Sequence, residues 1–212
     1  MHLEVAQRCL QAFTQLVPAR QAAFYCIDEQ LQACDFQLLH MNEAMHRDYL
    51  ANYRQVDPLH PRRCLASGLA VVPLHVARQQ QRPADGQRYQ RFLTHYGVVD
   101  VVEIIAQRDG KPHAAISMLR GPEQGAFTVA QLSQLHALQG LLEMAVATLP
   151  APQPALTPRE QQIALLLSQG ASNKDLARQL DLGLATVKTH LIHLFRKVGV
   201  RNRTELVSRL YL

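Results

Sequence analysis

The sequence predicts two domains of different fold class, an α+β domain over residues 1–149 and an all-α domain over residues 157–212. Three observations lead to this prediction. Before residue 150, short strand-like stretches are interspersed with stretches of helical spacing. Pro150, Pro152 and Pro154 then favour an extended linker over residues 150–156. After the linker only helical spacing occurs, bounded by capping residues and glycines.

Four segments of the first domain have the apolar spacing of helices: residues 3–16, 43–55, 86–96 and a long segment that begins at Thr128. The second of them should stop before Asp57–Pro58, because the residue before a proline avoids the α region. Gln131 stands three residues after Thr128, which is the spacing of a capping box. The long helix should carry an apolar stripe for the core, which would also suit a dimer seam, made of Val129, Leu132, Leu135, Leu138, Leu142 and Val146.

Two pairs of strands are expected in the first domain. Residues 22–29 and 32–40 are joined by a turn near Glu29–Leu31, and residues 98–107 and 113–120 flank the Asp-Gly pair of "RDGK". Residues 69–76 fit either a strand or a buried loop. Because the strands follow one another through short turns, the sheet should be antiparallel. With helices packed on it, the domain should be an α/β/α sandwich like the GAF and PAS sensor domains.

The second domain should contain four helices. Thr157 caps the first, which ends at Gly170, and Ser172 with Asp175 forms a capping box for the second, which runs to Leu180. The third is "ATVKTHLIHLFRKVGV", residues 185–200, and the fourth starts near residues 202–204. Two short helices joined by a tight turn with glycine form the helix-turn-helix pattern.

Composition predicts a soluble cytoplasmic protein. The start of the chain lacks the features of a signal peptide, and no apolar stretch approaches the roughly 20 residues that span a bilayer. Four cysteines, without the tight spacing of metal ligands, are expected to be reduced thiols: Cys9, Cys26, Cys34 and Cys64. Cys26 and Cys34 would face each other if the first hairpin loop is centred on Gln30, which leaves a redox switch as a minor alternative. The His and Cys of "LHPRRC" with His75 are an equally minor metal candidate, and no metal or cofactor is predicted.

Charge is distributed unevenly between the domains. Residues 1–155 hold 13 basic and 13 acidic side chains, whereas residues 156–212 hold nine basic and four acidic, so the whole formal charge of +5 lies in the last quarter. A basic module attached to a neutral one is typical of a polyanion-binding domain carried by another domain.

The third helix of the second domain has two distinct faces. Val187, Leu191, Leu194 and Val198 form a core stripe. The opposite face carries Lys188, Thr189, Ile192, His193 and Arg196. Such a face is either merely solvated or suited to the DNA major groove, where Lys188 would donate to guanine or phosphate and Thr189 and Ile192 would contact a thymine methyl. Arg196, Lys197, Arg201 and Arg203 would meet phosphates.

Residues 156–210 resemble the DNA-binding domain of the LuxR family of bacterial transcription regulators, through "LTPRE", Gly170, "SNKDLA", "TVKTH" and "KVGVRNRTE" in order. The resemblance implies that Lys188, Thr189 and Ile192 face bases and that Thr186 and His190 lie near the DNA backbone. It also implies phosphate contacts from Asn173 and Lys174 and dimer contacts from Leu206, Val207 and Leu210. Ala164 stands where the family usually has Leu, to be compensated by Leu165 or Leu167, and Ile192 replaces a residue that is often polar.

The stretch "YLANYRQVDPLHP" resembles the autoinducer-binding domain of quorum-sensing LuxR regulators. By that resemblance Tyr49 and Tyr53 would hold the polar head of a ligand, Asp57 would accept from its amide, and Ser117 would add a polar contact. Tyr49 replaces a usual Trp, and the Asp-Pro pair follows the aromatics closely. In the alternative interpretation, both tyrosines pack one helix face against the sheet and Asp57 caps a turn.

These observations favour a transcription regulator that acts as a homodimer on palindromic double-stranded DNA, gated by a small molecule in the first domain. The alternative is a constitutive or partner-controlled regulator without a ligand. Control by aspartyl phosphate is not expected, because the acidic pair and the parallel βα alternation of a receiver domain are missing. Neither a nucleophile with its base nor a phosphate loop is present, so the chain is predicted not to be an enzyme, and no membrane partner is expected.

Overall fold

The computed structural model describes residues 2–149 and 156–211, and the chain divides into two compact units, Met1–Pro152 and Gln153–Leu212. The three prolines of the predicted linker lie outside the described residues. Within the described residues no helix is both long and apolar enough to cross a membrane.

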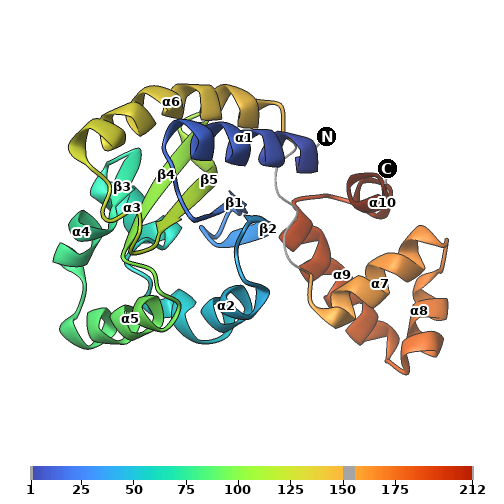
Figure 1. The fold of residues 1–212 in the computed structure, drawn as a ribbon. Coiled ribbons are helices and arrows are strands. Elements are labelled where there is room, and N and C mark those ends of the chain that lie inside the picture. Colours follow the sequence, from blue (N-terminus) through green and yellow to red (C-terminus); the bar gives the residue numbers. More distant parts are fainter. Residues whose placement is uncertain (1, 150–155, 212) are drawn as a thin grey trace. The chain divides into compact units, whose positions relative to one another are not determined.

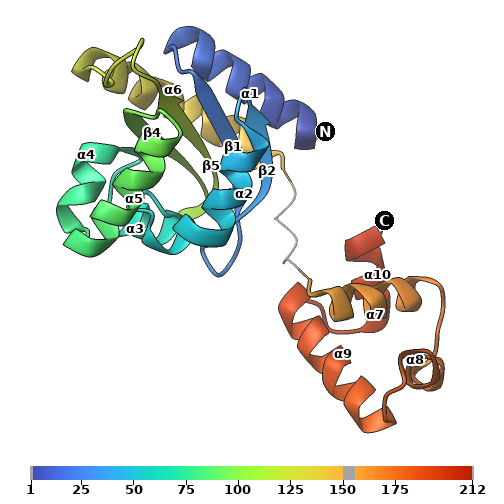
Figure 2. The same cartoon turned by 60° about the horizontal axis from the view of Figure 1, so that its bottom comes forward.

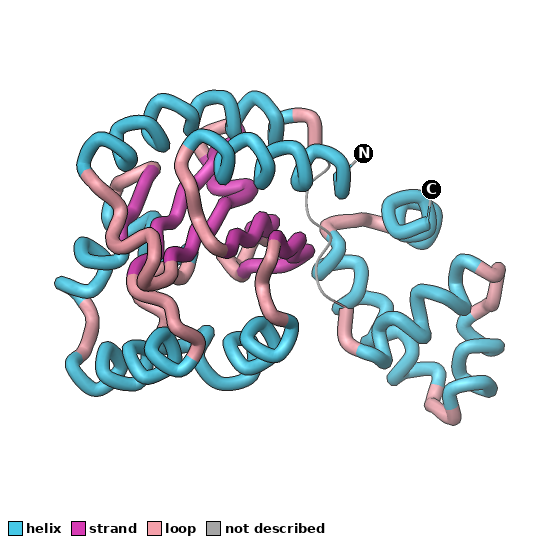
Figure 3. The backbone as a smooth tube through the Cα atoms, viewed as in Figure 1, coloured by secondary structure: helices cyan, strands magenta, loops and turns pink. Residues whose placement is uncertain are grey.

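The first unit is built on a five-stranded sheet in which every neighbouring pair is antiparallel, with the order β2-β1-β5-β4-β3. Its strands are β1 (Gln21–Ile27), β2 (Ala33–Leu39), β3 (Val71–Pro73), β4 (Asp100–Arg108) and β5 (Lys111–Arg120). Two helices, α1 (His2–Leu16) and α6 (Val129–Ala147), cover one face of the sheet. The other face is covered by α2 (Glu43–Asp48), α3 (Pro61–Ser67), α4 (Leu74–Ala77) and α5 (Pro83–His95). Figures 1, 2 and 3 show this three-layer arrangement, which confirms the predicted α/β/α sandwich.

The sheet has a core on each side because successive side chains of a strand point to opposite faces. Phe24 is buried beneath α1 and α6, whereas its neighbour Tyr25 is buried on the side of α2–α5. On that second side, Ala23, Ser117 and Glu103 form one row across β1, β5 and β4, since Ser117 is the register partner of both other residues. The register therefore places an acidic side chain in the middle of a buried sheet face.

The segment predicted as one helix over residues 43–55 is broken into three pieces. Helix α2 ends at Asp48, a π-helical turn follows over Tyr49–Tyr53, and a 3-10 turn spans Arg54–Val56. A π-helical turn closes after more residues than an α-helical one, yet residues four apart still lie on nearly the same side, and Tyr49 and Tyr53 both contact the Phe92 ring. The prediction of one regular helix over residues 43–55 is wrong.

Other boundaries also differ from the predicted ones. Helix α3 was not predicted, and α5 starts three residues early because Pro83 occupies its first turn. The ambiguous stretch around Val71 forms a short edge strand, continues as α4 and ends in a 3-10 turn over Arg78–Gln80. The capping box of Thr128 and Gln131 is present, but Val129 is largely exposed and does not belong to the core stripe of α6.

The second unit consists of α7 (Pro158–Ser168), α8 (Asn173–Leu180), α9 (Leu184–Val198) and α10 (Arg203–Tyr211), which confirms the four predicted helices. The capping boxes of Thr157 with Glu160 and of Ser172 with Asp175 are both formed. Its core contains Ile163, Ala164, Leu167, Leu176, Val187, Leu191, Leu194, Val198 and Leu206. Leu167 packs beside the small Ala164, whereas Leu165 is exposed and does not compensate for it.

Candidate functional site

Helix α9 presents the surface that the sequence predicts for DNA. Its apolar stripe is buried, and the side chains of Lys188, Thr189 and Arg196 are exposed beside it. Ile192 is 62% exposed, which is unusual for a large aliphatic side chain. The side chains of Lys188 and Arg196 make no hydrogen bond or ion pair with any other described residue, while the Thr189 hydroxyl donates to the Ala185 carbonyl at 3.1 Å. The face is therefore available to an external partner.

The other predicted DNA contacts surround this face. Thr186 is exposed and His190 is half-buried on α9. Asn173 and Lys174 open α8, directly after the capping residue Ser172, and Lys174 is exposed. Helices α8 and α9 pack on each other through the buried core, which fixes the recognition helix on its support.

Two basic residues that were expected to meet phosphates have partners inside the unit. The Lys197 ammonium donates to Glu160 Oε2 at 2.6 Å, which ties α9 to α7. Arg203 donates to the carbonyl oxygens of Ala171 at 2.7 Å and Leu167 at 3.0 Å, at the C-terminal end of α7. Both side chains therefore make contacts within the unit, and their phosphate contacts stay predictions.

The assignment of dimer contacts to α10 also needs a correction. Leu206 is fully buried in the core of its own unit, and a buried side chain offers no surface to a second copy. Val207 and Leu210 are partly buried against the same core. The apolar spacing of α10 is explained mainly by packing within the unit.

The first unit contains a partly open cavity of about 60 Å³ between the sheet and helices α2 and α5. The row Ala23, Ser117 and Glu103 lies on its sheet side. Its other lining residues are Tyr25, Phe36, Met41, Met45, His46, Tyr49, Asp57, Tyr89, Phe92, Val101 and Leu119. Since one water molecule needs about 10–15 Å³ of such space, the cavity has room for several waters, whereas a benzene-sized molecule, which occupies a cavity of roughly 150 Å³, would require its wall to move outward.

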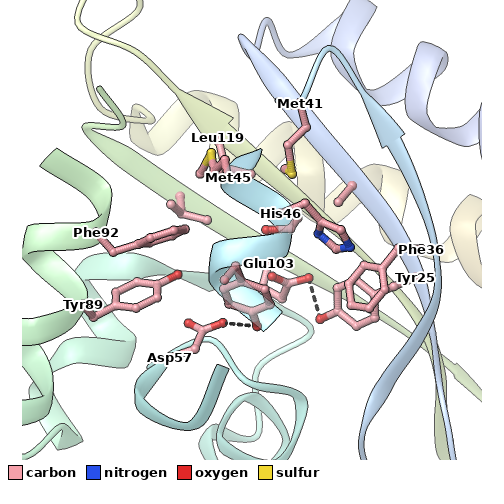
Figure 4. A pocket seen from close by; sticks show the side chains of 14 residues that line it. Tyr25, Phe36, Met41, Met45, His46, Asp57, Tyr89, Phe92, Glu103 and Leu119 are labelled. Atoms are coloured by element: carbon pink, nitrogen blue, oxygen red, sulfur yellow. Dashed lines mark hydrogen bonds between the residues drawn. The ribbon is translucent and has the colours of Figure 1, made fainter. Parts of the chain in front are cut away.

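Two carboxyl groups converge on this cavity, as Figure 4 shows. Glu103 is 3% exposed and its Oε1 accepts from the Tyr25 hydroxyl at 2.9 Å. Asp57 is 6% exposed; its Oδ2 accepts from the Tyr49 hydroxyl at 2.8 Å and its Oδ1 from the Leu59 amide at 2.8 Å. Uncharged donors thus supply the hydrogen bonds of both acids.

Burial raises the pKa of both carboxyl groups. For Glu103 the increase is large; burial is its main cause and the nearby Asp57 carboxyl adds to it, although hydrogen bonds from Tyr25 and Ser117 lower it in part. For Asp57 burial again dominates, opposed by hydrogen bonds from Tyr49, Leu59 and Tyr89 and by the charge of Arg63. Perturbed acids that meet in a cavity are typical of a functional site.

The four residues predicted to hold a ligand do not all reach the cavity. Tyr49, Asp57 and Ser117 line it, whereas Tyr53 lies outside its lining. The Tyr53 ring packs on Phe92 with 4.6 Å between ring centroids, and the Arg88 guanidinium stands 5.6 Å from its centroid. Tyr49 contacts the same Phe92 ring, with 6.2 Å between centroids, so both tyrosines lie on the side of α5, but only Tyr49 reaches the cavity.

Sequence reasoning missed Tyr25, Tyr89 and Glu103 in the cavity wall. The signal for Glu103 was present in "VVDVVEIIAQ", because alternation places Val101, Glu103 and Ile105 on the same buried face. An acid at an inward position of an apolar strand is rare unless it is paired or functional. For Tyr25 and Tyr89 the local sequence gave no such signal, since a buried tyrosine is ordinary in a core.

Cysteine and metal chemistry find little support. Cys26 and Cys34 are register partners in the first hairpin, and the Cys34 thiol lies 3.5 Å from the Cys26 carbonyl oxygen. Both remain thiols, and burial raises the pKa of each to about 12, which makes the reactive thiolate scarce. Among the described residues, no group of three His, Cys, Asp or Glu side chains is arranged to hold a metal ion.

Comparison with known proteins places this geometry in context. Residues 154–210 match the profile of the family described as bacterial regulatory proteins, luxR family. Over 217 aligned residues the chain is 36% identical to the monoamine regulon transcriptional regulator of Klebsiella aerogenes, and the match covers 98% of this chain and 91% of that protein.

Solved structures show a similar fold at low identity. SdiA in complex with octanoyl-rac-glycerol is 16% identical with a TM-score of 0.52, covering 97% of this chain and 86% of that one. The GAF domain/HD domain protein from Geobacter sulfurreducens is 14% identical with a TM-score of 0.51, covering 68% of this chain and 91% of that one. The first unit therefore shares its fold with GAF-like domains as well as with regulators.

Proposed function

Since this chain belongs to the luxR family of bacterial regulatory proteins and is a transcription regulator, we propose that it binds palindromic DNA as a homodimer and that a small molecule in the cavity of its first unit controls it. The observation that carries the control by a small molecule is the partly open cavity, with the buried acids Glu103 and Asp57 in its wall. A unit that served only for dimerisation or for docking a partner would be expected to pack solidly between Tyr49, Asp57 and the sheet.

On the DNA side, the proposed base contacts are Lys188, Thr189 and Ile192. Their exposure on one face of α9, above a buried stripe, supports insertion into the major groove. Thr186, His190, Arg196, Asn173 and Lys174 surround that face and are the proposed contacts to the DNA backbone. One helix contacts only a few base pairs, so two copies on two half-sites are needed for useful specificity.

Exposed apolar side chains on α6 support the homodimer. Leu141 is 59% and Met144 71% exposed. Because they are three positions apart on α6, their side chains lie on the same side of the helix. A second copy of α6 would bury both. The same surface would suit a protein partner, which keeps partner control as the alternative function.

The name of the Klebsiella aerogenes relative indicates which genes are concerned. That protein is a regulator of a monoamine regulon. Because the match extends over nearly the whole of both chains, we infer that this chain also regulates genes of amine metabolism. The inference concerns the regulated genes and leaves the nature of the effector to be derived from the cavity.

Thermal melting of the full chain tests the control by a ligand. The panel should contain acyl-homoserine lactones, acylglycerols, amines and unrelated metabolites. A ligand at about 100 times its Kd should add about 2.7 kcal/mol to the stability of the unit that binds it. Ala23→Leu, which fills the sheet side of the cavity, should abolish the response, and Tyr53→Phe, outside the cavity, should keep it. Absence of any response in the unmodified chain would favour partner control.

A further inference from the structure

The cavity contains two buried acids, and within residues 2–149 and 156–211 neither carboxyl has a basic side chain as its hydrogen-bond or ion-pair partner. Building on the proposed control by a small molecule, we infer that its ligand is a small primary amine with an aromatic ring, bound as an ammonium ion between Glu103 and Asp57. The ammonium would supply the positive charge that the protein itself does not place there.

The contacts of the two acids support this assignment. Among the described residues neither carboxyl forms an ion pair. Arg63, whose charge lowers the pKa of Asp57, donates to the backbone carbonyl oxygens of Asp57 at 2.9 Å and of Gln55 at 3.2 Å, and not to the carboxylate. A buried carboxylate without a cation costs several kcal/mol, and proteins retain such groups mainly at functional sites. An ammonium group has three donors, enough for both carboxyl groups.

The rest of the cavity wall fits an aromatic ring on a short chain. Phe36 lies against Tyr25 with 5.4 Å between centroids, and Phe92 lies 5.8 Å from Tyr89 and 6.2 Å from Tyr49. Aromatic walls bind a ring through edge and offset contacts and also attract a cation. The space of about 60 Å³ is smaller than the roughly 150 Å³ of a cavity that binds benzene, so the wall has to move outward to admit a ring, and an extended acyl chain would need far more room. Figure 4 shows the aromatic side chains around the two acids.

The inference has a second consequence, which is the release of a proton when the amine binds. The groups that face Glu103 are the carboxyl of Asp57, the hydroxyls of Tyr25, Ser117, Tyr49 and Tyr89, and the thiol of Cys64, and His46 lines the same cavity. Because burial and Asp57 raise the pKa of Glu103, this carboxyl holds a proton more readily than an exposed one. An arriving ammonium favours the ionised carboxylate, so binding releases that proton to solvent. Amine binding should therefore become tighter as pH rises through the raised pKa of Glu103.

The test is calorimetric titration of the full chain with 2-phenylethylamine, in parallel with 2-phenylethanol, which has the same ring and chain length but no charge. Saturable binding of the amine, with proton release measured from buffers of different ionisation enthalpy, is the expected result. Glu103→Gln and Asp57→Asn should each weaken binding by at least about 30-fold, the usual cost of removing one partner of a buried charge pair. Glu143→Gln, on α6 at the other face of the sheet, is the matched control and should bind normally.

The outcomes separate this inference from the proposed function. If 2-phenylethanol or an acylglycerol binds as tightly as the amine, and Glu103→Gln binds it unchanged, the amine assignment is overturned while control by a small molecule stands. If putrescine binds and 2-phenylethylamine does not, the aromatic part is wrong. If no compound of the panel binds to the folded chain, both proposals fail together.

Discussion

The two units place their functional side chains at opposite positions relative to their cores. In the second unit Lys188 and Ile192 stand on the outside of α9, while Val187 and Leu191 beside them fill the core. In the first unit the candidate site lies inside, and Glu103 is surrounded by core residues. An external site can change without affecting the fold. An internal site cannot, because the same side chains determine both ligand binding and stability.

The electrostatics of one glutamate in each unit shows the same difference. Partial burial alone would raise the pKa of Glu160, but hydrogen bonds from Lys197 and Thr157 lower it below its ordinary value of 4.5. Burial raises the pKa of Glu103, which has only uncharged donors. The second unit pairs its acid with a cation, whereas the first gives its acid only uncharged hydrogen-bond donors.

Lys188→Ala should produce the largest effect on function with almost none on stability. If Lys188 contacts a base, specific binding should weaken by about 1–3 kcal/mol and selectivity should relax at that position. Stability should stay within about 0.5 kcal/mol, since the side chain is exposed. Fluorescence anisotropy with specific and scrambled DNA at one salt concentration measures both the affinity for the specific site and the selectivity over scrambled DNA.

Lys174→Ala is the matched control, because a phosphate contact weakens all sequences equally. If Lys188→Ala behaves like Lys174→Ala, then Lys188 is a phosphate contact. The recognition face would then be smaller than proposed.

Glu103→Gln should instead raise the stability of the unliganded first unit. A carboxyl whose folded pKa is raised stabilises the fold most below its ordinary value of 4.5 and loses that contribution as pH rises through the folded pKa. At neutral pH the amide avoids this loss, and each kcal/mol gained should raise the melting temperature by about 2–4 °C. Melting curves between acid and neutral pH should converge at the acid end. A lower melting temperature at neutral pH would mean that Glu103 is structural.

The difference between an external and an internal site also explains which parts of the molecule could be predicted from the sequence. The proposed DNA surface lies within one contiguous stretch, where capping boxes, helical spacing and basic residues all agree, so its helices and their exposed face were predicted correctly. The cavity joins Tyr25, Asp57, Tyr89 and Glu103 from four distant segments: the sheet brings Tyr25 and Glu103 together, Tyr89 comes from α5, and Asp57 follows the 3-10 turn. Periodicity indicates which face of an element is buried but not which distant residue it meets. Tyr53 was therefore misplaced and Glu103 overlooked.

Glu160→Gln should have a pH dependence opposite to that of Glu103→Gln. A lowered folded pKa contributes stability above the ordinary value of 4.5, and this contribution is lost as pH falls through the folded pKa. The substitution should cost the second unit about 1 kcal/mol at neutral pH, since the pair with Lys197 is only partly buried, and less in acid. Circular dichroism melting at both pH values measures it. Glu4→Gln, which breaks the exposed pair with Arg8, should change nothing measurable. An equal loss of stability at both pH values would mean that the effect comes from the capping box of Thr157 with Glu160 and not from the charge of Glu160.

Ile192→Ala should have the smallest effect and the most local one. An exposed aliphatic side chain on a recognition face has no hydrogen bond to make, and its natural partner is a thymine methyl group. The substitution should cost about 1 kcal/mol at one T-containing step, leave binding to sites without that step unchanged, and leave stability unchanged. Competition between paired sites that differ at this step measures the change. If selectivity is unaffected while the chain becomes less prone to associate, the exposed Ile192 serves contact between copies, and the outside of α9 carries assembly as well as recognition.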